Sequence, residues 1–140
     1  MATTTTGAPF SIFQVAGRAM SAQLTRMNTT ASNLANVGGV AGSADAAYKT
    51  LKPVFRTSFD AASGLSTVDV QQIVTAGEAP TKRYDPTNPL ADKDGNVFEA
   101  AVDETRELVD MMETARTYQN NVEVMQTAKS LILDTLKMGR

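Results

Sequence analysis

Acidic and amide side chains gather in one short stretch of the chain, where their spacing resembles part of a calcium-binding loop. Asp92, Asp94 and Asn96 stand at alternate positions. An EF-hand loop that began at Asp92 would need a glycine at its sixth position and a bidentate glutamate at its twelfth. Those positions hold Val97 and Asp103, so both requirements fail. We therefore interpret the stretch as a polar turn.

Two other short patterns suggest chemistry and also fail. Gly38, Gly39 and Gly42 form a glycine-rich segment, but it lacks the Lys–Ser/Thr pair that a phosphate-binding loop requires, so we interpret it as a hinge. A glycosylation sequon at Asn28 falls inside a predicted helix, and we interpret it as coincidence.

The composition removes most of the remaining catalytic chemistry. The chain has 140 residues with no histidine and no cysteine. It therefore lacks the commonest general base, the commonest metal ligand, the thiolate and any disulfide. We find no catalytic constellation, and the sequence predicts a protein that is not an enzyme and has no cofactor or metal site.

The first part of the chain carries a long heptad pattern instead. Its seam residues follow one another at spacings of 3 and 4: Phe10, Phe13, Gly17, Met20, Leu24, Met27, Ala31 and Leu34. This period is typical of helices that wind around one another. Gly17 lies on the seam, where a close approach of a neighbouring backbone would explain a glycine.

The last part of the chain repeats the pattern. Its seam contains Leu108, Met111, Ala115, Tyr118, Val122 and Met125, and it runs on through Ile132 and Leu136. A chain of this size needs two such seams only if they pack together or pack on other subunits. We therefore predict that both seams are subunit-interface residues.

Capping residues set the expected helix bounds. The first helix is predicted over about residues 9–36, since Pro9 suits a first helical turn and Gly38 follows as a stop signal. The second is predicted to run from Asp103, as N-cap, to a stop at Gly139. Each would be roughly 40 to 50 Å long.

The middle of the chain reads as β structure and linkers. Residues 38–47 are small and predict a linker. Residues 48–59 and 67–74 predict the strands of a β-hairpin. Residues 78–98 contain three prolines and predict an extended rigid connector.

The expected fold is mainly α with a small β insert, the two long terminal helices forming a coiled-coil-like pair. We expect three segments: an N-terminal helix of an inner tube (1–37), a β-rich and extended middle (38–102) and a C-terminal helix of the tube (103–140).

Charge is unevenly distributed along the chain. Residues 1–44 carry only Arg18 and Arg26, whereas seven acids lie between Glu99 and Glu123. Opposite signs favour pairing of the two helices, within or between subunits.

The net charge of −2 argues against nucleic acid as a partner, and no apolar run is long enough to predict a transmembrane segment. A secretory signal fits poorly, because no Lys or Arg precedes Arg18.

Three segments together resemble the bacterial flagellar basal-body rod proteins. They read NTTASNLANV (28–37), YDPTNPLADKDGNV (84–97) and YQNNVEVMQTAKSLILDTL (118–136). The first contains the ASNLAN motif shared by rod and hook proteins, and through it the resemblance adds Asn33 and Asn36 to the interface residues. The second segment and the short length point to the proximal rod. The family motif often continues to Thr or Ser, but Val37, Gly38 and Gly39 follow here.

This resemblance implies a structural function. The protein would be an axial subunit of the proximal rod, the drive shaft and export channel that crosses the periplasm, and it would be required for flagellum assembly and motility. It would be exported unprocessed by the flagellar type III apparatus. Its partners would be itself in a helical tube, other proximal and distal rod proteins, and the membrane-ring complex at the base.

Three alternatives differ from this reading. The chain could be another rod or hook-family axial protein, a helical export adaptor or chaperone, or a periplasmic cell-wall enzyme, of which the last is disfavoured by the missing catalytic groups. An adaptor should be compact and monodisperse alone, whereas a rod subunit should order its terminal helices only in the assembly.

Overall fold

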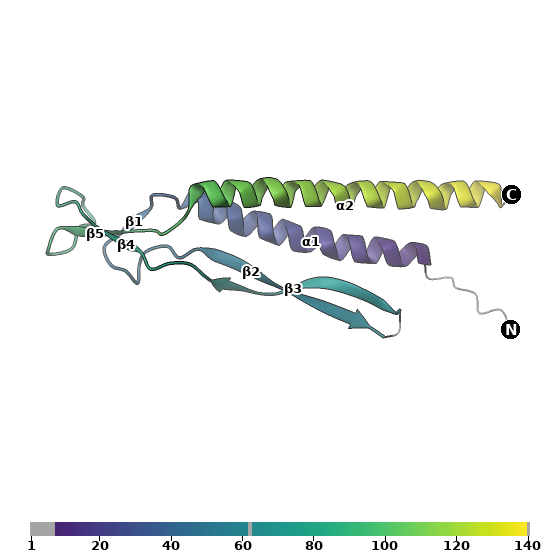
Figure 1. The fold of residues 1–140 in the computed structure, drawn as a ribbon, viewed down its shortest axis with the longest axis horizontal. Coiled ribbons are helices and arrows are strands. Elements are labelled where there is room, and N and C mark those ends of the chain that lie inside the picture. Colours follow the sequence, from purple (N-terminus) through teal and green to yellow (C-terminus); the bar gives the residue numbers. More distant parts are fainter. Residues whose placement is uncertain (1–7, 62, 140) are drawn as a thin grey trace.

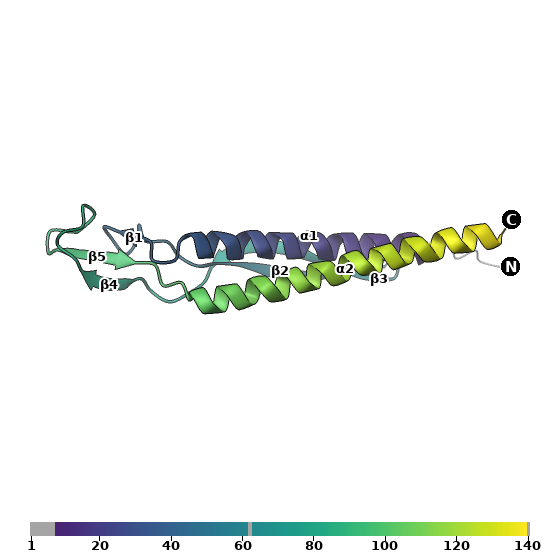
Figure 2. The ribbon, with the colours of Figure 1, turned by 90° about the horizontal axis from the view of Figure 1, so that it is seen from above.

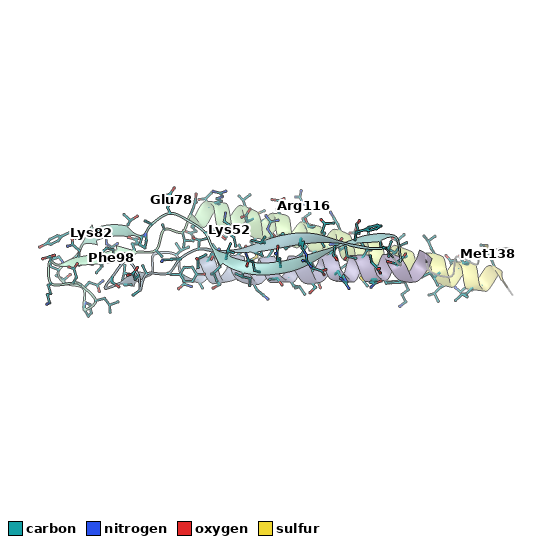
Figure 3. The ribbon with its side chains drawn as sticks, turned by 90° about the horizontal axis from the view of Figure 1, so that it is seen from below. Lys52, Glu78, Lys82, Phe98, Arg116 and Met138 are labelled. Carbon is teal, nitrogen blue, oxygen red and sulfur yellow. The ribbon has the colours of Figure 1, made fainter. Side chains whose placement is uncertain are left out.

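The protein is an elongated molecule in which two long helices run beside a β-hairpin, and a second small sheet lies at one end (Figure 1). The computed structural model describes residues 8–61 and 63–139, with side chains from residue 11 onward. Figure 3 shows Met138 at one end of the molecule, and Lys82 and Phe98 in the small sheet at the other.

The two predicted helices form as expected. Helix α1 spans Ala8–Ala35 and helix α2 spans Glu104–Met138. The side chain of Asp103 accepts a hydrogen bond from the backbone N–H of Arg106, which caps α2, and Gly139 ends it. The helices run antiparallel and cross at a shallow angle (Figures 1 and 2). Because α2 has 35 residues and α1 has 28, the C-terminal turns of α2 project beyond α1 (Figure 1).

The predicted hairpin is confirmed with slightly shifted bounds. Strand β2 (Leu51–Asp60) pairs antiparallel with β3 (Leu65–Thr75), and a bulge shifts the register between Val54 and Phe55. Gly64 turns the chain with φ +68°, a conformation that favours glycine. The hairpin packs along α1, and in the view of Figure 1 it lies below the two helices.

The second sheet corrects two expectations. The supposed linker contains β1 (Val40–Ala41), and the supposed connector contains β4 (Thr81–Tyr84) and β5 (Asn96–Glu99). These strands form an antiparallel sheet in the order β1-β5-β4. A two-residue strand has no periodicity of its own, so its pairing partner stabilises it and the local sequence does not reveal it.

The interior contains small and polar side chains. Among the described residues, the buried apolar side chains are Ala16, Ala22, Ala47, Val97, Ala100 and Ala128, and the buried polar ones are Thr29, Thr30, Asn33, Thr50, Thr67, Glu107 and Thr114. Large apolar side chains contribute most to folding when buried, about 1.5–3 kcal/mol each. Here they lie mainly outside, and 16 of them in the described part of the chain are exposed.

Candidate subunit-interface site

A buried asparagine joins the ends of both helices to the hairpin. Asn33, with 1% of its surface exposed, lies in the last turns of α1. Its Nδ2 donates to the backbone carbonyl of Leu51 at 2.9 Å and to Oε2 of Glu107 at 3.0 Å. Its Oδ1 accepts from the hydroxyl of Tyr48 at 2.8 Å and from the N–H of Leu51 at 2.9 Å. We call Asn33, Tyr48, Leu51 and Glu107 the asparagine junction.

The asparagine junction fixes the relative positions of three elements. Leu51 begins β2, Glu107 lies in the first turn of α2, and Asn33 closes α1. Both amide hydrogens and the amide oxygen of Asn33 are used, so the buried side chain is fully satisfied. A buried polar network of this kind specifies one arrangement, since each partner would be left unpaired in another.

The two cations of α1 form ion pairs within the chain. Arg26 lies 3.5 Å from Asp110 on α2, which confirms for this pair that the oppositely charged helices attract each other within one subunit. Arg18 lies 3.0 Å from Asp69 on β3 and so attaches the hairpin to α1. Both pairs are partly exposed, so each contributes about 1 kcal/mol or less.

The predicted seam residues are mostly only half-buried within the chain. Among the predicted interface residues whose side chains are described, only Asn33 is buried. Leu24, Ala31, Leu108 and Leu136 are exposed. The others are half-buried: Phe13, Gly17, Met20, Met27, Leu34, Asn36, Met111, Ala115, Tyr118, Val122, Met125 and Ile132. Phe10 lies in α1, but its side chain is outside the described part.

Full burial of the large seam residues between the two helices is therefore not seen within one subunit, and the assignment of the seams to contacts between subunits stays a prediction. Apart from the nearby backbone of α1 itself, no atom of the described residues lies within 4 Å of the position that a Cβ would take at Gly17. The described part of one subunit therefore shows no close approach at Gly17.

The exposed surface of α1 carries a single charge. The exposed residues of the helix whose side chains are described are Ile12, Gln14, Arg18, Ser21, Leu24, Asn28, Ala31 and Ala35, and Arg18 is paired with Asp69. A solvated helix face usually carries more charges than this. A long face with one paired charge can lie against another subunit without burying an unpaired charge.

The C-terminal turns of α2 expose apolar side chains. Leu131 is 62% exposed, Leu136 64% and Met138 82%. We call residues 131–138 the α2 overhang, because these turns extend past the described part of α1 (Figure 1). Apolar side chains this exposed at the end of a long helix indicate a contact surface.

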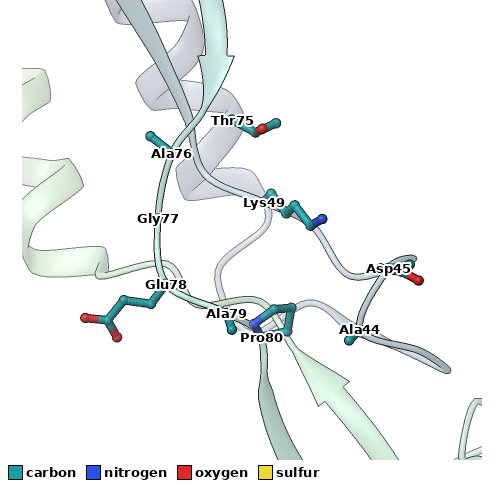
Figure 4. Close-up of a pocket in the computed structure, with 9 residues that line it drawn as sticks. All are labelled: Ala44, Asp45, Lys49, Thr75, Ala76, Gly77, Glu78, Ala79 and Pro80. Atoms are coloured by element: carbon teal, nitrogen blue, oxygen red, sulfur yellow. The ribbon is translucent and has the colours of Figure 1, made fainter.

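A cleft of about 410 Å³ lies between the hairpin and the second sheet (Figure 4). It is lined mainly by small residues, and Glu78 points away from Lys49 there. In the loop before β5, Asp92 accepts from the backbone N–H groups of Asp94 and Asn96, which confirms the polar turn. The hydrogen bond from Asn96 lowers the pKa of Asp92. The described residues contain no acidic cluster that could hold a metal ion.

Sequence reasoning missed the partners of Asn33 and the exposed face of the hairpin. Glu107 resembles an ordinary acid near a helix N-terminus, where it suits the helix dipole, so nothing local marks it as buried. Phe55 and Phe59 fit the strand pattern, but only the packing on α1 decides which face stays exposed. The sequence offered one signal for this site, which is the amide residue Asn33 at the end of the predicted helix.

Comparisons with known proteins show what the chain is similar to. The family described as "Flagella basal body rod protein" matches residues 13–42, and the family described as "Flagellar basal body rod FlgEFG protein C-terminal" matches residues 94–138. The chain is 44% identical over 131 residues to the flagellar basal-body rod protein FlgC of Salmonella typhimurium, covering 92% of this chain and 96% of that protein.

Two further relatives carry the same name. The FlgC protein of Escherichia coli O6:H1 is 41% identical over 130 residues, and that of Yersinia enterocolitica is 40% identical over 129 residues. In both cases the match covers 92% of this chain and 96% of the relative. No helix in the described part of the chain is long and apolar enough to cross a membrane.

Proposed function

Because the chain belongs to the flagellar basal-body rod proteins of the FlgC type and is a structural subunit of the rod, we propose that its two helices form the wall of an inner tube and that its β elements face outward. Assembly of the flagellum, and hence motility, depends on such a subunit. The tube would enclose the channel through which later components are exported.

The distribution of large apolar side chains carries this proposal. The buried side chains are mostly alanine and threonine, whereas leucines, methionines and phenylalanines are exposed on α1, α2 and the hairpin. A protein that functions alone would bury these groups, because exposed apolar surface of this extent favours association. The free energy that stabilises the helices therefore comes largely from neighbouring subunits.

The partners follow from the same reasoning. We propose that the chain contacts copies of itself and other proximal and distal rod proteins through its helices, and the membrane-ring complex at the base of the rod. A subunit with a weak core of its own is also suited to passage, largely unfolded, through a type III export apparatus, and to folding where neighbours cover its seams. The site of assembly would be the part of the rod that crosses the periplasm.

The free protein should contain less helix than the assembled one. Helices that lack tertiary partners are marginal in water, and few large side chains hold α1 and α2 together within one chain. We expect the far-ultraviolet circular dichroism of dilute protein to indicate low helicity that rises with concentration. High helicity with a sharp melting transition independent of concentration would contradict this and favour a self-contained adaptor.

A charge on the outward face of α1 should block assembly without unfolding the chain. Leu24 is 43% exposed in the subunit, so Leu24→Asp has little effect on the isolated fold, but a buried carboxylate cannot be accommodated between subunits. We expect normal synthesis, no incorporation into basal bodies and no swimming. Leu34→Asp should have the same outcome.

The matched control is Ala44→Asp, which adds a charge at an exposed position in the loop after β1. This variant should swim. Normal swimming of Leu24→Asp and Leu34→Asp would show that the predicted α1 seam does not lie between subunits.

A further inference from the structure

Helix α1 contains one side-chain oxygen that is buried without a partner. The amide oxygen Oε1 of Gln23 is shielded from solvent, and no described residue donates a hydrogen bond to it. Among the side-chain atoms of the described residues it is the one that is both buried and unpaired. Buried polar atoms in native proteins are almost always hydrogen-bonded, so this exception calls for a physical explanation.

The side chain of Gln23 lies on the face of α1 that packs on α2. Gln23 comes four residues after Ala19 and three before Arg26, so these three side chains share one face. Ala19 lines a cleft together with Asn121 of α2. Arg26 pairs with Asp110 of α2 at 3.5 Å. Because the helices are antiparallel, Gln23 lies opposite the stretch of α2 between these two contacts.

The threonine hydroxyls on that stretch of α2 are already used. Thr114 is fully buried, and its hydroxyl donates to the backbone carbonyl of Asp110 at 2.6 Å. The hydroxyl of Thr117 donates in the same way to Glu113 at 3.0 Å. Each hydroxyl has only one hydrogen to donate, so neither can satisfy the amide oxygen of Gln23 in this arrangement. The oxygen therefore opposes the packing of the two helices.

A second amide on the same helix shows the opposite case. Asn33 has partners for its amide hydrogens and for its oxygen in the asparagine junction. The ion pair of Arg26 with α2 lies on the same side of Gln23 as that junction. In the described part of α1 the buried apolar side chains are the alanines Ala16 and Ala22, and both precede Gln23. The helix pair is thus firmly held at the C-terminal end of α1 and weakly held before Gln23.

We propose that Gln23 is a weak point of the α1–α2 pair, from which the two helices separate when neighbouring subunits cover their seams. Separation exposes the amide oxygen to water or to a donor on a neighbour, which removes the cost of burying it unpaired. The asparagine junction keeps the other end of the pair together. The inference rests on the proposed tube, in which neighbours cover both helices, and names the residue that lets the pair open.

Replacing Gln23 by methionine should stabilise the free subunit. Methionine has a similar length and helix propensity but no strong hydrogen-bonding group that burial would leave unpaired. We expect the folding equilibrium constant to rise about tenfold, which corresponds to about 1.4 kcal/mol. Far-ultraviolet circular dichroism of the dilute purified chain, titrated with urea, measures this constant.

The matched control is Gln126→Met, the same change at an exposed position of α2 outside the predicted seam. It removes no buried oxygen, so the folding equilibrium constant should stay close to the native value. Gln23→Leu is a second variant at the buried position and should shift the constant in the same direction as Gln23→Met. If both variants at residue 23 are no more stable than the native chain, the buried oxygen does not weaken the pair and the proposal is overturned.

Hydrogen exchange of the free chain locates the weak point. Backbone amides of α1 that precede Gln23 should exchange severalfold faster than those between Gln23 and Asn33, and the difference should shrink in Gln23→Met. Fraying of a helix end also gives a gradient, but that gradient would not respond to residue 23. An unchanged gradient in Gln23→Met would therefore contradict the proposal.

Competition in cells tests the role of the weak point in assembly. The native chain and a variant carry different epitope tags, are synthesised together, and are quantified in purified basal bodies. We expect Gln23→Met to be incorporated severalfold less than the native chain, because its helices resist separation, and Gln126→Met to be incorporated equally. Equal incorporation of Gln23→Met would overturn the role in assembly. Failure of the proposed tube would look different, because Leu24→Asp would then be incorporated.

Discussion

Replacing Asn33 by alanine is expected to stop incorporation of the subunit into the rod and to abolish swimming. The substitution removes four hydrogen bonds at once and leaves Glu107, Tyr48 and the backbone of Leu51 without their buried partner. Leaving a buried donor or acceptor unsatisfied costs about 1–3 kcal/mol, and more when the group is charged. Such a loss is a large fraction of the stability of a typical domain, about 5–15 kcal/mol.

Asn36→Ala is the matched control, because it is the same change three residues further along the chain. The Asn36 side chain is half-buried and donates to the carbonyl of Ser32 in the last turn of α1, so its loss costs about 1 kcal/mol. Swimming in soft agar and immunoblots of purified basal bodies measure both variants. Equal behaviour of the two would show that the asparagine junction does not hold the helices to the hairpin.

A chain that ends at Ser130 is expected to be synthesised normally but to be absent from basal bodies. The truncation removes the α2 overhang, whose side chains are largely exposed in the subunit, so the isolated fold loses little. The assembled rod loses much more, at about 1.5–3 kcal/mol for each large apolar side chain that a neighbour would bury. Cell fractionation followed by immunoblotting measures both quantities.

A full-length control separates the apolar surface from the length of the helix. The double substitution Leu133→Ser and Leu136→Ser keeps all of α2 but makes the overhang more polar. It should reproduce the truncation phenotype in weaker form. If the shortened chain is found in basal bodies at native levels with working flagella, the overhang is not an assembly element.

The sequence by itself determined the helices and the absence of the commonest catalytic groups. Heptad spacing, the Asp103 cap and the Gly139 stop are local signals, and α1 and α2 begin and end close to the predicted positions. The alternation in residues 67–74 likewise predicted the hairpin, because a strand with one covered face shows its period locally. Three motif segments sufficed for the family resemblance, which the relatives confirm.

Only the tertiary structure decided what these elements cover and what they leave exposed. Asn33 and Glu107 are 74 residues apart, and β1 forms only because it pairs with β5 more than 50 residues later. The exposure of Leu24 on α1 and of Phe59 on the hairpin was also beyond the local pattern, since an amphipathic period identifies an apolar face but not its partner. Within one subunit small residues bring α1, α2 and the hairpin together, and the larger apolar side chains remain on the outside.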